Sequence, residues 1–331
     1  MKFVVFGEQK RVGLLEGDSV VDVNNAAAKY LSEKRGAKSA AEEAAANAPA
    51  NLTAFIEAGD RALDLTREAA EYVAGSDDAS ITSLAKNTKL HAPWPQRRIA
   101  CAGANYAQHT RNAIKNSSGE EISLEEIKKR IRGNAPAGFW KITHEVMGPG
   151  DDVTYPGRTQ LFDYEAEAAF VFGKRGMDIP GSKLSDYIWG VTLLNDWSIR
   201  EMAPIQIPMS FNLPKNFDCC VSLGPCIVVG EADPGNLDVK LTVNGETRQD
   251  YNSSDMEYSF AEIVEFLSQD LTFLPGDVLS GGTSFGTAMD ASQRGPDGKP
   301  LPDLFLSPGD VVEMSSPQVG SLRNGIVKKK S

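Results

Sequence analysis

Three Pro-Gly-Asp turns constrain the fold of this chain more than any other feature of its sequence. They occupy positions 149–151, 275–277 and 308–310, and each leads into valine-rich sequence. Proline and glycine favour a tight turn, and β-branched residues after a turn favour an extended strand. The second half of the chain is therefore predicted to be mainly β-structure, arranged as a sandwich, roll or barrel with flanking helices.

The helical segments expected in this half are short, one around Tyr187 and Ile188 and one at 259–271. They are too few to cover both faces of a parallel sheet. The predicted fold class is therefore α+β and predominantly β.

The first part of the chain has a different composition. Short β-rich runs open the sequence, and residues 26–85 are then rich in alanine, glutamate, lysine and leucine, with apolar positions at helical spacing. A proline-containing linker follows at 91–98. Since 331 residues exceed the usual single-domain length of about 100–200, we expect a small N-terminal α/β domain at 1–95 with an Ala-rich helical insert, and a larger domain at 96–331.

Charge and composition exclude several classes of protein. The formal charge of −11, from 34 basic and 45 acidic side chains, disfavours binding to nucleic acid or to a membrane surface. There is no apolar run of about 18 residues, and the N-terminus lacks the pattern of a signal peptide. Four cysteines without metal-binding or disulfide spacing suggest a reducing compartment. We expect a cytoplasmic protein.

The segment LFDYEAEAAFVFGK, at 161–174, places acids inside an otherwise apolar run. In a strand, side chains alternate between the two faces, which would put Asp163, Glu165 and Glu167 on one face. Such a group of like charges is stable only in water, beside basic partners, or around a hard cation. A solvated edge strand is the alternative. However, the same face becomes apolar within two residues, which favours a divalent cation such as Mg²⁺, Mn²⁺ or Ca²⁺.

Two further residues are candidates for the same site. Asp196 directly follows an apolar run, where the end of a strand would project it into a pocket, although a lone acid in such a place is more often the N-cap of a helix. Of the three histidines, His109 follows a strand and a small-residue turn and is the best-placed base. His91 lies in the proline linker, and His144 remains an alternative.

Six segments, in order, resemble successive motifs of the fumarylacetoacetate hydrolase family. The resemblance runs from about Ile99 to Val327, and the opening of the chain is also similar to that family. The segments are GANYAQH, FDYEAEAAFVFGK, NDWSIRE, PKNFDCCVSLGP, FLPGDVLSGGTSFG and LSPGDVVEMSSPQVGSLRN.

The resemblance implies a mixed β-sandwich roll, a homodimer, and a divalent metal, most often Mg²⁺, held by Glu165, Glu167 and Asp196. Lys215 and Thr283 match family positions that face substrate. Tyr106, Lys141, Arg200 and Gln206 are further candidates for substrate binding. Asp163 has no ligand role in the family pattern, so we expect it at the rim of the site, in contact with water.

The activity implied first is hydrolysis of a C–C bond in an acylpyruvate or 2,4-diketo acid, as in degradation of aromatic compounds or sugar acids. A metal would polarise the chelated substrate, His109 would activate water, and Lys215 would neutralise developing negative charge. The alternatives are a 2-oxo acid lyase, decarboxylase, hydratase or tautomerase on the same site, or a catalytically silent metal-binding interaction protein.

Some positions depart from the family pattern. Asn112 stands where many relatives have a glutamate that orients the histidine, so a remote acid such as Glu121 would have to complete the catalytic pair, or the reaction is not hydrolysis. Ala102 replaces a fourth metal-binding carboxylate of the family's eponymous enzyme. Ala203 replaces a substrate-contacting glutamine, with Gln206 nearby but out of register.

Overall fold

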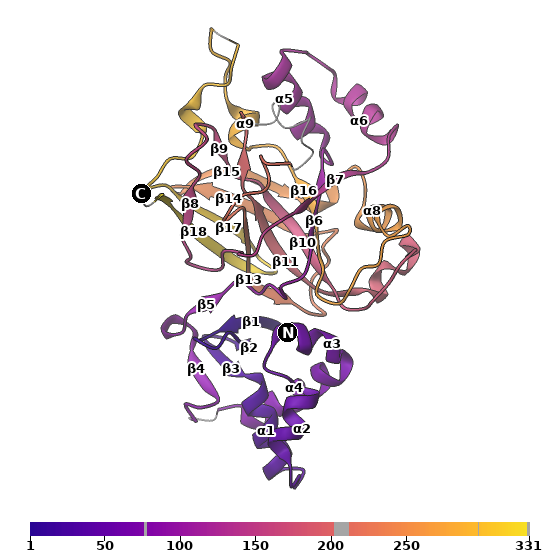
Figure 1. Ribbon diagram of the computed structural model, residues 1–331, viewed down its shortest axis with the longest axis vertical. Coiled ribbons are helices and arrows are strands. Elements are labelled where there is room, and N and C mark those ends of the chain that lie inside the picture. The colour runs from indigo at the N-terminus through magenta and orange to yellow at the C-terminus, as the bar shows by residue number, and fades with distance from the viewer. Residues whose placement is uncertain (76–77, 202–211, 297, 330–331) are drawn as a thin grey trace.

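Strands outnumber helices in the described part of the chain. The computed structural model describes residues 1–75, 78–201, 212–296 and 298–329 (Figure 1). The strands are β1 (Lys2–Phe6), β2 (Arg11–Glu16), β3 (Ser19–Asp22), β4 (Thr82–Leu84), β5 (Leu90–His91), β6 (Ile99–Gly103), β7 (Ala137–Lys141), β8 (Val153–Tyr155), β9 (Phe162–Asp163), β10 (Ala166–Phe172), β11 (Ile188–Asp196), β12 (Ser198–Ile199), β13 (Val221–Val228), β14 (Asp238–Val243), β15 (Glu246–Asn252), β16 (Val278–Thr283), β17 (Val311–Ser316) and β18 (Gly320–Lys328).

The α-helices in the described part of the chain are few and short. They are α1 (Val23–Glu33), α2 (Ala40–Asn47), α3 (Leu52–Ala58), α4 (Asp60–Val73), α5 (Ala107–Ser118), α6 (Leu124–Arg132), α8 (Phe260–Leu267) and α9 (Ala288–Ala291). Short 3₁₀ helices lie at Ala85–Asn87, Gly181–Asp186, Ser253–Asp255 and Pro302–Leu304. None of the described helices combines the length and the apolar character needed to cross a membrane.

Two sheets pack face to face to form the larger part of the molecule. The large sheet has the strand order β4-β3-β2-β1-β13-β11-β10-β16-β6-β7, with β5 paired to β1; the second has the order β15-β14-β17-β18-β8. Most neighbours are antiparallel, but β16 pairs with β6 and β18 with β8 in parallel. The second sheet packs on β10, β11 and β13, and apolar side chains of both sheets fill the space between them. The prediction of a predominantly β, mixed-sheet α+β fold is confirmed.

The Pro-Gly-Asp turns lead into strands as predicted. Strands β8, β16 and β17 begin within two residues of the three turns. The central glycines, Gly150, Gly276 and Gly309, have φ angles of 76°, 90° and 106°. Residues with a side chain rarely adopt such angles, so glycine is needed at the point where the chain reverses.

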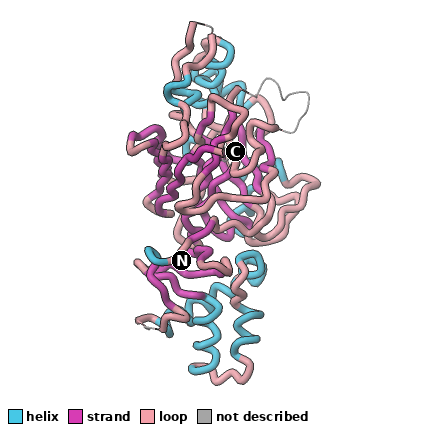
Figure 2. The backbone as a smooth tube through the Cα atoms, turned by 60° about the vertical axis from the view of Figure 1, so that its left-hand side comes forward, coloured by secondary structure: helices cyan, strands magenta, loops and turns pink. Residues whose placement is uncertain are grey.

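The N-terminal strands continue the large sheet. Strand β1 pairs antiparallel with β13, with Phe3 opposite Ile227. Helices α1 to α4 lie together at one end of the molecule, against this part of the sheet (Figure 2). Asp22 and Asn51 cap α1 and α3 by accepting hydrogen bonds from backbone N–H groups of the first turn. The helical insert thus covers one face of a shared sheet, while the domain boundary at residue 95 remains a prediction.

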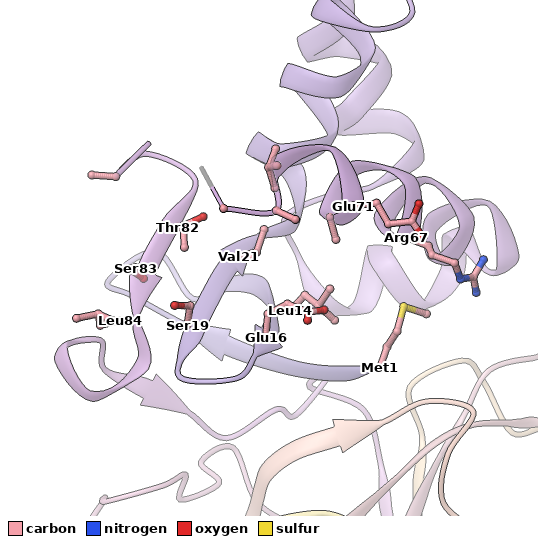
Figure 3. Close-up of a pocket in the computed structure, with 15 residues that line it drawn as sticks. Met1, Leu14, Glu16, Ser19, Val21, Arg67, Glu71, Thr82, Ser83 and Leu84 are labelled. Atoms are coloured by element: carbon pink, nitrogen blue, oxygen red, sulfur yellow. The ribbon is translucent and has the colours of Figure 1, made fainter. Parts of the chain in front are cut away.

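A cavity of about 740 Å³ lies in this N-terminal part (Figure 3). It is bounded by the C-terminal half of α4 on one side and by β2, β3 and β4 on the other. Its charged lining residues are Glu16, Arg67 and Glu71, beside apolar residues such as Leu14 and Val21. None of the described residues that line this cavity belongs to the acidic segment 161–174.

Candidate functional site

The acidic run is divided between two strands. A single strand was expected across 161–174, but β9 ends before Tyr164 and β10 begins after Glu165. The backbone N–H of Glu165 donates to the side-chain oxygen of Asn195 at 2.9 Å, and the backbone N–H of Asp196 donates to the Glu165 carbonyl at 2.9 Å. These bonds replace a regular ladder there, so the prediction of one continuous strand is wrong at these two residues.

Glu165, Glu167 and Asp196 converge at the junction of β10 and β11. One carboxylate oxygen from each lies within 4.8 Å of the others. All three residues are buried, with exposed fractions of 4%, 1% and 0%. Three inward-facing carboxylates are a set of hard oxygen donors that suits Mg²⁺, Mn²⁺ or Ca²⁺. They form the candidate metal centre.

Two lysines contact these carboxylates. The ammonium of Lys215 lies 2.7 Å from Oδ2 of Asp196 and 2.7 Å from Oγ of Ser198, and it also contacts Glu165. Lys141, at the end of β7, contacts the other oxygen of Asp196, and both of these side chains are fully buried. Asp196 is the last residue of β11, as predicted, and it is shared between the two ammonium groups.

Arg200 contacts Glu165, which is one of the three candidate metal ligands, and a fourth acid, Asp163. Its guanidinium donates to Oε1 of Glu165 at 2.6 Å and to Oδ2 of Asp163 at 2.8 Å. Asp163 is completely buried. The expectation that water would solvate Asp163 at the rim is therefore wrong: the guanidinium and three backbone N–H groups take the place of water around its carboxylate.

Glu167 is the carboxylate that fits a bound cation best. Its Oε2 accepts a hydrogen bond from the hydroxyl of Ser280, and within the described ranges no basic side chain forms an ion pair with it. Burial and the nearby charges of Asp196 and Glu165 raise the pKa of Glu167 well above its ordinary value. A buried anion without a basic partner is costly, so a divalent cation at this place would satisfy the donor set.

Glu165 has the opposite electrostatic environment. Burial alone would raise the pKa of Glu165, but the positive charges of Arg200, Lys215 and His109 together hold it well below its ordinary value. Glu165 therefore stays ionised, while its neighbour two residues along the chain favours the neutral form in the absence of a cation. Two adjacent carboxylates with divergent pKa values are typical of functional sites.

His109 lies in the first turn of α5, beside the acids. Its Nδ1 is 2.9 Å from Oδ2 of Asp290, and its Nε2 is 3.9 Å from Oε1 of Glu165. Burial lowers the pKa of His109, but the charge and hydrogen bond of Asp290 together with the charge of Glu165 outweigh this, so the net shift of the pKa is upward. With Asp290 as the acceptor for Nδ1–H, Nε2 is the nitrogen that faces the candidate metal centre.

Glu121 does not supply the acid of this pair. Its carboxylate is exposed and forms an ion pair with Lys115 at 2.8 Å. The oxygen of Asn112 accepts hydrogen bonds from Gln108 and Arg111. The prediction that Glu121 partners His109 is wrong because Asp290, far along the sequence, is brought to the imidazole by the short helix α9.

The remaining substrate-binding candidates lie in varied surroundings. The hydroxyl of Thr283 donates to the carbonyl of Ala166 at 2.9 Å, and Thr283 lies opposite Glu167 in the sheet. Tyr106 is buried at the start of α5, with its ring against that of Tyr251. Gln206 lies outside the residues that the structure describes. The roles of these residues toward a substrate remain predictions.

Sequence reasoning missed Asp290 and Ser280. Asp290 follows Thr287 by three residues, and the two form a capping box at the start of α9. That pattern signals a helix start, and nothing in it indicates a histidine partner. Ser280 lies within a glycine-rich strand and carries no signal of its contact with Glu167.

Residues 98–327 match the family model described as the C-terminal domain of fumarylacetoacetate hydrolase. The chain belongs to the fumarylacetoacetate hydrolase family. The resemblance seen in the motifs is thus confirmed over most of the chain.

Several relatives carry names that concern oxaloacetate. A Bacillus subtilis protein named oxaloacetate tautomerase YisK is 32% identical over 285 residues, which are 84% of this chain and 87% of that protein. A human mitochondrial protein named oxaloacetate tautomerase FAHD2B is 30% identical over 282 residues, 84% of this chain and 80% of that one. The chain is accordingly grouped with the enzymes of the fumarylacetoacetate hydrolase superfamily.

The fold also matches a solved member of the family. Maleylpyruvate hydrolase from Sphingobium sp. SYK-6, crystallised with manganese(II) and pyruvate, aligns over the whole of both chains with a TM-score of 0.68 and 22% identity. This likeness concerns the fold.

Proposed function

We propose that the protein is a divalent-metal-dependent tautomerase that interconverts the keto and enol forms of oxaloacetate or a closely related 2-oxo dicarboxylic acid. The observation that carries the proposal is the His109–Asp290 pair. Asp290 contacts Nδ1 of His109, and Nε2 of the same ring faces the buried carboxylates. A tautomerase needs one base beside a chelated 2-oxo acid, and this pair is placed to be that base. The names of the curated relatives support the same reaction.

Glu165, Glu167 and Asp196 would hold Mg²⁺ or Mn²⁺, with Ca²⁺ as a further hard cation of suitable chemistry. When bound, the cation would act as a Lewis acid toward the carbonyl oxygen of the 2-oxo acid. The donor set fits because the three carboxylates offer hard oxygen donors within 4.8 Å of one another, and Glu167 has no basic contact of its own among the described residues.

His109 would transfer the proton. With Nδ1–H donating to Asp290, the lone pair of Nε2 would take a proton from C3 of the keto form to leave an enolate, and the imidazolium would then give that proton to the 2-oxo oxygen to complete the enol; the reverse reaction runs the same two transfers backwards. Asp290 stabilises that imidazolium, which agrees with the raised pKa of His109. The pair therefore serves as base and acid in turn without a second catalytic group at C3.

Basic side chains would receive the negative charges of the substrate. Lys215 and Arg200 lie on two sides of Glu165, and Lys141 lies on Asp196. Once the carboxylates bind a cation, these donors are available to the carboxylate groups and to the negative charge that develops on the 2-oxo oxygen. A 2-oxo acid with two carboxylates suits a site with three such basic groups.

Hydrolysis of a C–C bond in an acylpyruvate or 2,4-diketo acid is the second candidate. Asn112 argued against it, because an amide cannot stabilise an imidazolium. Asp290 removes that objection, since a carboxylate does contact His109. The same pair could activate water for attack on a carbonyl. Decarboxylation or another lyase reaction of a 2-oxo acid would use the same groups.

One set of assays separates these reactions. Purified protein with Mg²⁺ or Mn²⁺ is given oxaloacetate, and the enol absorbance is followed together with pyruvate formation. Tautomerase activity speeds the keto–enol relaxation without producing pyruvate, whereas decarboxylation produces pyruvate. Acetylpyruvate serves as the second substrate, and pyruvate plus acetate from it would establish hydrolysis. A metal-binding protein without turnover of either compound would contradict the enzymatic proposal.

The setting of the enzyme is also part of the proposal. We place it in the cytoplasm, in 2-oxo acid catabolism, as a homodimer. Sedimentation equilibrium at micromolar concentration would measure the oligomeric state, and a monomer would refute that part.

A further inference from the structure

Asp163 connects two parts of the site that are separate in the sequence. On one side, Oδ2 of Asp163 accepts a hydrogen bond from Nε of Arg200, and a terminal nitrogen of Arg200 donates a hydrogen bond to Glu165. On the other side its two oxygens accept from the backbone N–H groups of Ala288 at 2.8 Å and Met289 at 3.0 Å, the first residues of α9. Helix α9 carries Asp290, the partner of His109.

Helix α9 is too short to hold its own orientation. It has four residues, so most of its backbone N–H and carbonyl groups need partners outside the helix. Asp163 takes N–H groups at its start, and the amide of Asn116 donates to the carbonyl of Ser292, just past its end, at 3.1 Å. Asn116 lies two turns after His109 on α5, so the imidazole and this amide approach α9 from one helix.

We propose that Asp163 is a positioning residue that fixes the metal-binding carboxylates and the His109–Asp290 pair relative to each other. The inference rests on the proposed roles of Glu165 and His109. One carboxylate sets the orientation of Arg200 against Glu165 and also sets the position of the α9 start that carries Asp290. Loss of its charge would therefore disturb both the metal affinity and the imidazole environment, although Asp163 contacts neither a metal ligand nor His109 directly.

The chain contains a matched control for this variant. Asp277 is also buried, pairs with Arg98 at 2.5 Å, and accepts backbone N–H groups of Arg98 and Leu274. It precedes β16, about 20 Å along the strand from Thr283 at about 3.3 Å per residue. Asp163→Asn and Asp277→Asn thus remove the same kind of charge from the same kind of environment, inside and outside the site.

The test compares the full-length wild type with these two variants, without requiring turnover. Mn²⁺ affinity is measured from the electron paramagnetic resonance signal of the free ion. The imidazole signals are measured by nuclear magnetic resonance, where the chain has three histidines to assign. Asp163→Asn is expected to weaken Mn²⁺ binding about 10–100-fold, as loss of outer partners of metal ligands does, and to shift the His109 signal. Asp277→Asn is expected to change neither, while lowering the melting temperature similarly.

A second variant removes one hydrogen bond between Asp163 and the start of α9 and leaves the contact of Asp163 with Arg200 in place. Ala288→Pro removes an N–H that Asp163 accepts, at the first helical position, where proline is tolerated. Thr287 before it already has a backbone compatible with a following proline, at φ −62° and ψ 161°. It should shift the His109 signal and leave the Mn²⁺ dissociation constant within about threefold of the wild type. This variant carries the test if Asp163→Asn does not fold.

The outcomes are distinct. The proposal is wrong if Asp163→Asn leaves either the Mn²⁺ affinity or the His109 signal unchanged, if Asp277→Asn changes both as strongly, or if Ala288→Pro leaves the His109 signal in place. If both readouts respond as expected and the wild type converts no 2-oxo acid, the proposed function fails and the positioning role of Asp163 stands.

Discussion

Two parts of the same sheet place their charges in opposite ways. Where α1 to α4 cover β1 to β3, the core is made mainly of apolar side chains such as Phe55, with one buried acid, Asp22, paired with Arg11, and ion pairs such as Arg67–Asp64 are exposed at the surface. At the junction of β10 and β11, the carboxylates and Lys141 are buried, and the side chains of Arg200 and Lys215 are only 13% and 14% exposed. The first arrangement keeps most charged groups in contact with water. The second removes charged groups from water, which costs free energy. A buried network of this kind is maintained for the chemistry that it allows, because well-packed apolar residues would be at least as stable.

Strand β11 belongs to both regions. Trp189, near its start, packs with Phe3 and Phe55, at ring-centroid distances of 5.4 and 6.2 Å. Asp196 ends the same strand, about 23 Å further on at about 3.3 Å per residue. Stability and function should therefore be separable along one strand, and the following variants test that separation.

The largest effect is expected from Glu167→Gln. Removal of a metal-binding charge should lower kcat/KM about 1000-fold or more, since a Lewis-acid metal contributes several kcal/mol to the transition state. Because the buried carboxylate lacks a basic contact among the described residues, the metal-free variant should unfold at a temperature no lower than the wild type. Calorimetry in EDTA and steady-state kinetics measure the two quantities. A strongly destabilised apo variant would show that Glu167 is a structural residue.

Phe55→Ala should have the opposite profile. Truncation of a fully buried aromatic ring costs about 3–5 kcal/mol of unfolding free energy. Because Phe55 contacts the far end of β11, the Mn²⁺ dissociation constant of the folded variant should stay within about twofold of the wild type. Urea unfolding and metal titration check this, and a large loss of metal affinity would mean that the helices control the site.

Asp290→Asn should reduce kcat/KM about 100-fold, within the range usual for loss of acid–base catalysis, and leave metal binding unchanged. The pKa of His109 is raised in the folded protein, so its pairing stabilises the fold below the unfolded pKa and ceases to do so as pH rises through the folded pKa. The difference in unfolding free energy between metal-free wild type and variant should accordingly be largest below about pH 6 and shrink toward alkaline pH. A difference that grows with pH would contradict the assigned pair.

Asp64→Asn should have the smallest effect. It neutralises a carboxylate as Glu167→Gln does, but the pair with Arg67 is exposed, with both side chains more than half accessible. Exposed pairs contribute about 0–1 kcal/mol. Thermal unfolding and kcat/KM should both match the wild type. A clear loss of activity would connect the cavity beside α4 with the catalytic site.

The sequence by itself determined the predominantly β character of the fold and pointed to the carboxylates that we propose as metal ligands. Pro-Gly-Asp turns placed three strands, and acids in an apolar run identified Glu165 and Glu167, because local backbone preference and the cost of burying charge act within a few residues. The family motifs added Lys215, which contacts Glu165 and Asp196.

The tertiary structure alone decided the partners. His109 and Asp290 are 181 positions apart, and α9 brings them within 2.9 Å. Asp163 was expected in water and lies instead under Arg200 and the start of α9. No local sequence pattern encodes such pairs. An acidic residue in a given local sequence is solvated or buried according to which distant segment of the chain packs against it.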